Sequence, residues 1–319
     1  MESLHILQLS DTHLRGERLP GTPDPDALWR RALEALDTLG ELDLIVLSGD
    51  LSDDGSIASY GHLRTTITQF AARHGDAALV WVPGNHDSRP GFRAVLGPGL
   101  SRAAVAAGAD ERPVFSARTI HGFRIIGLDS SVPGRSHGLV DDEQLAWLRD
   151  LLSVDCGAGS VVVVHHPPVA PVTPLHQGIG LINTERLADV LADSDVRLVL
   201  SGHYHHALID SIPGRDGAIP VVVAPGIINH NQVLAPRGHE LASAASGATL
   251  VELTTDPGSS ALDQPSAGRA LPARVRVIPV TLSPEPQLSL LDPDAVLALA
   301  GRIDASEQER RAARGTASR

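Results

Sequence analysis

Five short apolar segments of this sequence each end directly in side chains that can bind a metal ion or carry a proton. They lead into the motifs Asp11-Thr12-His13, Gly49-Asp50, Gly84-Asn85-His86-Asp87, His165-His166-Pro167-Pro168 and Gly202-His203-Tyr204-His205. Because these segments are continuously apolar rather than alternating, they predict strands that are buried on both faces. Ligands of an open α/β sheet bind beyond the carboxyl ends of its strands. If the strands are parallel neighbours, all five motifs lie at one edge of the sheet.

Helical patterns separate several of these strands, which predicts an α/β fold. Predicted strands cover residues 4–9, 42–47, 78–82, 124–128, 161–164, 197–200 and 220–223, and predicted helices cover 25–39, 56–74, 141–152 and 184–191. More strands and fewer helices are expected from about residue 207 to 280, where we predict a second sheet packed on the first. Residues 230–247 and 256–272 are predicted loops, and the charged, Ala-rich chain beyond about residue 304 is predicted to be a frayed helix or disordered.

Charge and composition exclude several classes of protein. The formal net charge is −12, so a nucleic-acid coat or a membrane-surface binder, which needs a basic face, is not expected. A small anionic substrate stays compatible, because bound cations can reverse the local charge. No apolar stretch approaches the ~20 residues of a membrane span, and no signal peptide is apparent. The single cysteine, Cys156, rules out an intrachain disulfide, and we expect a cytoplasmic protein.

The side chains in the five motifs are typical of a metal centre without thiolate ligands. Imidazole, carboxylate and an amide oxygen together suit manganese, iron or zinc. Each motif alone has a simpler interpretation: Gly-Asp after a strand is usually a turn, and His-His-Pro-Pro can be a strand ended by proline. The occurrence of all five at strand ends, in this order, favours a metal site over a coincidence of turns.

In this order the motifs resemble the pattern of the calcineurin-like metallophosphoesterase family, which is D-x-H, G-D, G-N-H-D, H-H-P-P and G-H-x-H. A closer resemblance, to the bacterial class III cyclic nucleotide phosphodiesterases and the related glycerophosphodiesterases, comes from residues 9–14, 80–82 and 131–134 together with Gly138 and Trp147. The resemblance covers roughly the first 230 residues and extends to the strands near residue 282.

The resemblance implies a four-layer α/β/β/α sandwich of two mixed sheets, within a catalytic domain of residues 1–292. Residues 293–319 would be a helical or disordered tail. It also implies two divalent metal ions. One ion would be bound by Asp11, His13 and His205, the other by Asn85, His165 and His203, and Asp50 would bridge both. His86 would lie over the substrate, oriented by Asp53, and close relatives suggest a homodimer.

A hydroxide held between two ions would attack phosphorus, and His86 would protonate the departing oxygen. A diester is favoured because residues 51–55 lack the arginine that follows the bridging aspartate in the protein phosphatases, although Arg15 and Arg89 could still reach the site. The subgroup points to 3′,5′-cyclic AMP, with Asn85, His86, His137 and His230 as candidate substrate-binding residues. A glycerophosphodiesterase and a phosphomonoesterase or nucleotidase are the alternatives, and a metal-containing nucleotide sensor or scaffold is a third.

Overall fold

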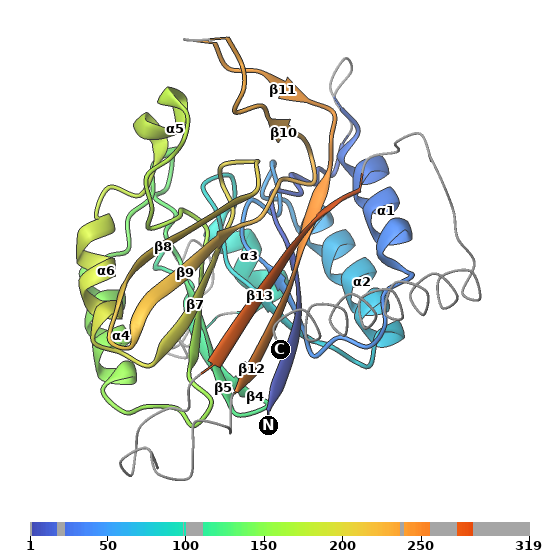
Figure 1. Cartoon of the computed structure of the whole chain (residues 1–319). Coiled ribbons are helices and arrows are strands. Elements are labelled where there is room, and N and C mark those ends of the chain that lie inside the picture. The colour runs from blue at the N-terminus through green and yellow to red at the C-terminus, as the bar shows by residue number, and fades with distance from the viewer. Residues whose placement is uncertain are drawn as a thin grey trace, which may run out of the picture. The chain divides into compact units, whose positions relative to one another are not determined.

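The computed structural model describes residues 2–17, 23–97, 99, 111–236, 239–255 and 273–282, all within a compact unit that spans Met1–Ser283. Its strands are β1 (Ser3–Leu9), β2 (Leu44–Leu47), β3 (Ala78–Trp81), β4 (Ser116–Ile120), β5 (Phe123–Leu128), β6 (Ser160–Val164), β7 (Val196–Ser201), β8 (Leu208–Gly214), β9 (Gly217–Val223), β10 (His230–Asn231), β11 (Ala242–Ser243), β12 (Gly247–Thr255) and β13 (Ala273–Thr281). Its helices are α1 (Pro25–Leu36), α2 (Ile57–Arg73), α3 (Arg89–Leu96), α4 (Asp142–Leu152), α5 (Pro174–Ile179) and α6 (Thr184–Ala192), as Figure 1 shows.

Two mixed sheets form the centre of this unit. The first has the strand order β13-β12-β1-β2-β3, in which β1, β2 and β3 are parallel and β12 and β13 are antiparallel to their neighbours. The second has the order β4-β5-β6-β7-β9-β8, with parallel strands β5, β6, β7 and β9 between two antiparallel edge strands. Both sheets therefore carry parallel strands whose carboxyl ends are available for a shared site.

The assignment of strands to sheets differs from the sequence-based expectation. The five motif strands do not share one sheet: β1, β2 and β3 lie in the first, and β6 and β7 lie in the second. The region from 207 to 280 does not form a separate sheet either, because β8 and β9 extend the second sheet whereas β12 and β13 extend the first. A strand that is apolar on both faces fits either sheet equally well, so its hydrophobic pattern does not identify its neighbours.

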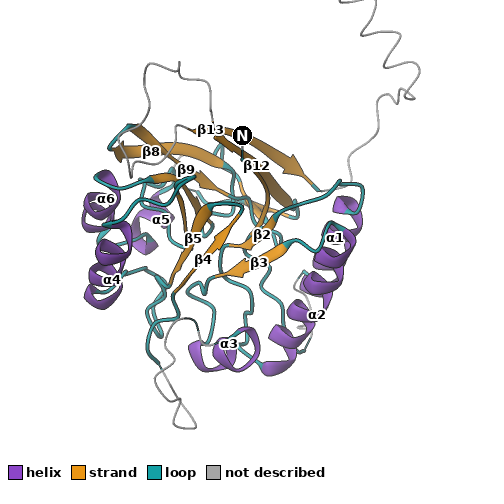
Figure 2. Ribbon diagram, turned by 90° about the horizontal axis from the view of Figure 1, so that it is seen from below, coloured by secondary structure: helices purple, strands orange, loops and turns teal. Residues whose placement is uncertain are grey.

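Three apolar clusters confirm the four layers. Successive side chains of β1 alternate between two of them: Leu4 and Ile6 pack between the two sheets, and Leu7 and Leu9 pack against the helices on the outer face. A third cluster joins the second sheet to α4 and α6. Figure 2 shows α1 and α2 on one outer side of the strands, and α4 and α6 on the other. Each central strand is thus covered on both faces, which explains its continuously apolar sequence.

Some local predictions were wrong or incomplete. The segment 230–247 is not strandless, because β10 and β11 form a short antiparallel pair in it; their few polar residues give no apolar signal. The helices α3 and α5 and the strand β4 were missed. Asp24 is the predicted N-cap of α1, but the helix ends at Leu36 instead of continuing to residue 39. The predicted loop 256–272 and tail 293–319 lie outside the described residues, so the domain boundary stays a prediction.

No helix in the described ranges has the length and apolarity needed to cross a membrane.

Candidate metal centre

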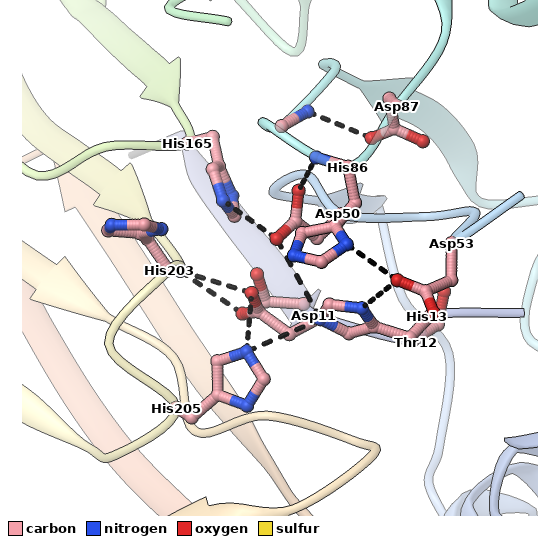
Figure 3. Close-up of polar contacts among 12 residues, drawn as sticks. Asp11, Thr12, His13, Asp50, Asp53, His86, Asp87, His165, His203 and His205 are labelled. Carbon is pink, nitrogen blue, oxygen red and sulfur yellow. Dashed lines mark hydrogen bonds and ion pairs between the residues drawn. The ribbon is translucent and has the colours of Figure 1, made fainter. Parts of the chain in front are cut away.

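The five motifs converge although their strands belong to two sheets (Figure 3). Within the first sheet, the backbone N–H of Asp11 donates to the carbonyl of Gly49 at 3.0 Å. Between the sheets, the backbone N–H of His203 lies 3.2 Å from each carboxylate oxygen of Asp11. The loop after β7 is therefore bound directly to the loop after β1, and the carboxyl ends of both sheets form one site.

The backbone is strained where the candidate ligands lie. Residues with a left-handed backbone include Asp11, His13, Asp50, His203 and His205, whose φ angles are 54°, 47°, 51°, 70° and 52°. Aspartate and histidine tolerate this region better than most residues, but each such conformation still costs free energy. Strain of this kind persists where the surrounding structure enforces it, and it concentrates at functional sites.

Two glycines are required by the close approach of the loops. A Cβ atom at Gly84 would overlap Oδ1 of Asp50, and a Cβ atom at Gly202 would overlap Oγ of Ser10 and lie 2.8 Å from Oδ2 of Asp11. Any larger residue at these positions would push a candidate carboxylate ligand out of place. The glycines in the G-N-H-D and G-H-x-H motifs therefore keep room for the carboxylates beside them.

Four candidate ligands form a first group. His205 Nε2 lies 3.2 Å from Asp11 Oδ1 and 3.3 Å from His13 Nε2, and His13 Nε2 lies 3.7 Å from Asp50 Oδ2. One ligand atom from each of these residues lies within 4.8 Å of the others. Two carboxylates and two imidazoles at this spacing are suited to binding a divalent cation.

A second group adjoins the first through Asp50. His165 Nε2 lies 3.4 Å from Asp50 Oδ2, the same oxygen that faces His13. His165, His166 and His203 lie close enough together to share an ion, and Oδ1 of Asn85 is buried without a hydrogen-bond donor from the protein. Asp50 thus lies between two sets of donors, an arrangement that suits a dinuclear metal site.

A hydrogen bond at one ring nitrogen orients the imidazoles of His165, His203 and His205. His165 Nδ1 donates to the Ser48 carbonyl at 2.8 Å, and His203 Nε2 donates to the Ile179 carbonyl at 2.9 Å. Asn229 Oδ1 lies 2.8 Å from His205 Nδ1 in the same way. Histidines that bind metals are oriented by such partners, which fix the nitrogen that carries the proton. The rings are therefore arranged for metal binding.

Charge coupling keeps the carboxylates ionised. Burial alone would raise the pKa of Asp11, but the neighbouring His205 lowers it to about 2. Burial likewise opposes ionisation of Asp50, yet His165 and His13 hold its pKa well below the usual range. The pKa of His165 shifts in the opposite direction. Burial alone would lower it, but the Asp50 carboxylate outweighs burial and raises the pKa of His165 to about 9. Asp50 and His165 thus stabilise each other's charged forms.

His86 and Asp53 form a pair on the solvent side of the centre. His86 Nδ1 lies 2.5 Å from Asp53 Oδ1, which also lies 3.2 Å from His13 Nδ1. The His86 side chain is 45% exposed, and its backbone N–H donates to Asp50 Oδ1 at 2.9 Å. Arg15 forms an ion pair with the other oxygen of Asp53. The proton-carrying ring predicted from the sequence is thus accessible and oriented by a carboxylate.

Arg89 does not reach the site. Its buried guanidinium donates to Asp129 Oδ2 at 2.8 Å and to the Ser131 carbonyl at 2.7 Å. Of the two arginines considered from the sequence, only Arg15 approaches the centre, and it does so through Asp53.

The remaining candidates are placed less centrally. His137 lies in the turn after β5, next to Ser136, whose carbonyl faces Nε2 of His166 at 3.2 Å. His230 lies in β10, beside Asn231, whose backbone N–H donates to the His205 carbonyl at 2.9 Å. Their role in substrate binding stays a prediction.

Two residues of the site were missed in the sequence. Asn229 fixes the His205 ring, and His176 in α5 packs edge-on against His203 with ring centroids 5.8 Å apart. Asn229 gave a weaker signal than the five motifs, because the mostly apolar residues 224–228 separate it from the end of β9. His176 gave no comparable signal, because α5 is short and does not follow a strand directly.

We expect Asp87→Asn to destabilise the loops that carry the ligands. Asp87 Oδ2 accepts hydrogen bonds from the backbone N–H groups of Leu51 and Gly84 at 3.0 and 2.8 Å, and Oδ1 accepts from Ser52 N–H and Tyr60 O–H at 3.0 and 2.9 Å. An asparagine offers only one oxygen, so its NH₂ group faces two donors, at a cost of about 1–3 kcal/mol in the free energy of unfolding.

Denaturant unfolding of the metal-free protein measures this cost. Tyr60→Phe is the comparison variant: it removes one donor to Asp87 and the acceptor of the Ser88 N–H, but it leaves the carboxylate with its three backbone donors. Equal stabilities of Asp87→Asn and the unmodified protein would contradict the clamping role of Asp87.

Comparison with known proteins agrees with the geometry of the site. A family model described as calcineurin-like phosphoesterase matches residues 4–207, a range that contains all five motifs. A probable cyclic nucleotide phosphodiesterase of Rhodococcus erythropolis is 38% identical over 222 residues, covering 69% of each chain. A cAMP/cGMP dual specificity phosphodiesterase of Mycobacterium tuberculosis is 38% identical over 255 residues, covering 79% of this chain and 76% of the relative.

The fold also matches solved structures. A purple acid phosphatase isolated from yellow lupin (Lupinus luteus) seeds aligns with a TM-score of 0.53 and 13% identity, over 78% of this chain and 49% of that one. At this identity the match concerns the fold alone, and it agrees with the layers described above.

Proposed function

Because the chain belongs to the calcineurin-like phosphoesterase family, we propose that it is a metal-dependent phosphodiesterase that hydrolyses 3′,5′-cyclic AMP. The observation that carries this proposal is the pair of metal-ligand groups that Asp50 joins. It is supported by 38% identity to each of two relatives named as cyclic nucleotide phosphodiesterases.

We assign the donor groups to two divalent cations. Asp11, His13 and His205 would hold one, Asn85, His165 and His203 the other, and Asp50 would contact both. Such ions supply a water-derived nucleophile at neutral pH and offset the negative charge of the phosphodiester. The donor set of imidazole, carboxylate and amide oxygen, with Cys156 elsewhere in the chain, favours manganese, iron or zinc.

His86 is the proton donor in this proposal. Asp53 binds its Nδ1, which leaves Nε2 as the atom that can protonate the departing ribose oxygen. The Arg15 guanidinium pairs with the other oxygen of Asp53, and Asp53 orients the His86 ring. Asn85 and His86 together would hold the phosphate, and the carboxylate pair of Asp11 and Asp50 would remain ionised beneath it.

The charge of the site supports a diester over a monoester. A monoester dianion carries more charge and commonly requires arginine clamps. Residues 51–55 contain no arginine, Arg89 is bound to Asp129, and Arg15 is paired with Asp53. Two divalent ions, two carboxylates and a hydroxide leave about one positive charge, which matches a diester monoanion.

The small phosphodiester is the partner that these observations support. That the protein is cytoplasmic, forms a homodimer and binds no nucleic acid stays a prediction; the net charge of −12 supports the last of these.

Hydrolysis of 3′,5′-cyclic AMP by manganese-reconstituted protein tests the proposal, with a glycerophosphodiester and 5′-AMP as parallel substrates. We expect cyclic AMP to be converted to 5′-AMP, which should then persist. Protein treated with a chelator is the control, and activity should return when manganese is added back. Cleavage of another ester without turnover of the cyclic nucleotide would refute the substrate and retain the metal centre. Faster cleavage of 5′-AMP would instead indicate a monoesterase.

A further inference from the structure

A group of imidazoles outside the proposed ligand set adjoins the candidate ligands His203 and His205. We call His176, His206 and His230 the imidazole cluster. The His176 and His206 rings lie with centroids 6.1 Å apart, and Nδ2 of Asn231, next to His230, lies 3.3 Å from Nε2 of His176. These residues come from α5, from the loop after β7 and from β10, so three separate segments bring them together.

The segments of the cluster are fastened to each other and to the centre. The Leu175 N–H at the start of α5 donates to Glu240 Oε1 at 3.2 Å, which joins α5 to the segment between β10 and β11. The Asn231 N–H donates to the His205 carbonyl at 2.9 Å. Figure 1 shows α5 and the β10–β11 pair beyond the same ends of the sheets. The imidazole cluster is therefore held next to the place where the substrate phosphate would bind.

The ring nitrogens of His206 and Nε2 of His230 are buried without a side-chain hydrogen-bond partner among the described residues. His206 is only 6% exposed, and the Tyr204 backbone is the polar group that faces its ring. By contrast, His176 Nδ1 has a partner in Thr173 Oγ1 at 2.7 Å. Burying an unpaired polar group costs free energy, so such groups in a native structure call for an explanation.

The arrangement is not that of a further metal site. Among the described residues, no group of metal-binding side chains with ligand atoms within 4.8 Å of one another includes His206 or His230. Without a third ligand beside them in the described part of the chain, they suit a ligand with several polar atoms better than a single ion. A neutral imidazole offers one donor and one acceptor, which matches the amino group and ring nitrogens of adenine.

We propose that the imidazole cluster binds the nucleoside part of the substrate, with His206 and His230 as specificity-determining residues that hydrogen-bond the base. This inference rests on the proposed function. The phosphate would lie at the metal centre, and the cluster adjoins that centre through His203 and His205. The ring of Tyr204 is nearly parallel to that of His206, at a centroid distance of 5.8 Å, and packs against it.

The test compares a nucleoside substrate with a diester that has no nucleoside. His206→Phe and His230→Phe keep an aromatic ring but remove both ring nitrogens, and His62→Phe, at a 46% exposed position on α2, is the matched control. For each protein, kcat/KM is measured with cyclic AMP and with bis(4-nitrophenyl) phosphate. We expect the ratio of the two values to fall about tenfold in each cluster variant, mainly through KM, and to change less than about twofold in His62→Phe.

Other outcomes contradict the proposal in distinguishable ways. If both substrates lose activity equally in the cluster variants, these residues act through His205 or the fold, and the proposal is wrong. If wild-type protein cleaves cyclic AMP and the ratio is unchanged in the variants, only the nucleoside proposal fails. If the wild type cleaves bis(4-nitrophenyl) phosphate but no cyclic nucleotide, the proposed function fails as well. His206→Gln and His230→Gln, which keep a donor and an acceptor, should recover part of the ratio and guard against misfolding of the Phe variants.

Discussion

Asp50→Asn is expected to lower kcat on a phosphodiester by about 10³-fold, because the metal centre supplies several kcal/mol of transition-state stabilisation. Asp50 Oδ2 lies 3.7 Å from His13 Nε2 and 3.4 Å from His165 Nε2, so this one oxygen adjoins both donor groups. The amide has nearly the same shape as the carboxylate but no negative charge, and its NH₂ group repels a cation. Both ions should therefore bind more weakly.

Metal content and activity are measured together for this variant. Inductively coupled plasma mass spectrometry after manganese reconstitution should show fewer ions per chain than in the unmodified protein. Asp142→Asn is the matched control, because the Asp142 side chain is 82% exposed on α4 and pairs with Arg186 at the surface. It should keep both metal and activity. Retention of full metal content and activity in Asp50→Asn would show that Asp50 does not bridge the ions.

The strands and the candidate site residues stand out in the sequence for the same physical reason. Strands such as β2 and β6 are covered on both faces, so their apolar runs are recognisable, and the polar side chains that end them must lie at the rim of a sheet. The contact of His203 with Asp11 joins the rims of two sheets, which the sequence did not indicate.

What the sequence did not indicate depends on contacts between distant segments. The strand β12 pairs with β1 in the first sheet. Its hydrophobic pattern would fit either sheet, so hydrophobicity alone does not predict this pairing. Arg89 looked available for a phosphate, but tertiary structure places its guanidinium against Asp129. The segment 230–247 looked like an open polar loop, whereas Asn229 and Asn231 fasten its start to His205. Polar contacts of this kind leave no periodic signal.

His86→Ala is expected to lower kcat for cyclic AMP by about 10²- to 10⁴-fold, the usual contribution of a positioned general acid. The ribose oxygen that departs is a poor leaving group and needs a proton, which we assign to His86 Nε2. A nitrophenolate departs readily without one. The same variant should therefore lose much less activity on bis(4-nitrophenyl) phosphate, if the proton is what His86 supplies.

The leaving-group comparison separates proton transfer from binding of the phosphate. An equal loss of kcat on both substrates would mean that His86 acts only by holding the phosphate and does not protonate the departing oxygen. Asp53→Asn should show the same selectivity with a smaller loss, because it leaves the His86 ring in place but removes the carboxylate that lies 2.5 Å from its Nδ1. His62→Ala on α2 serves as the control for loss of an exposed imidazole. Since His86 contributes only its backbone N–H to Asp50, metal content should be preserved in His86→Ala, and a loss of metal there would assign the ring to the centre itself.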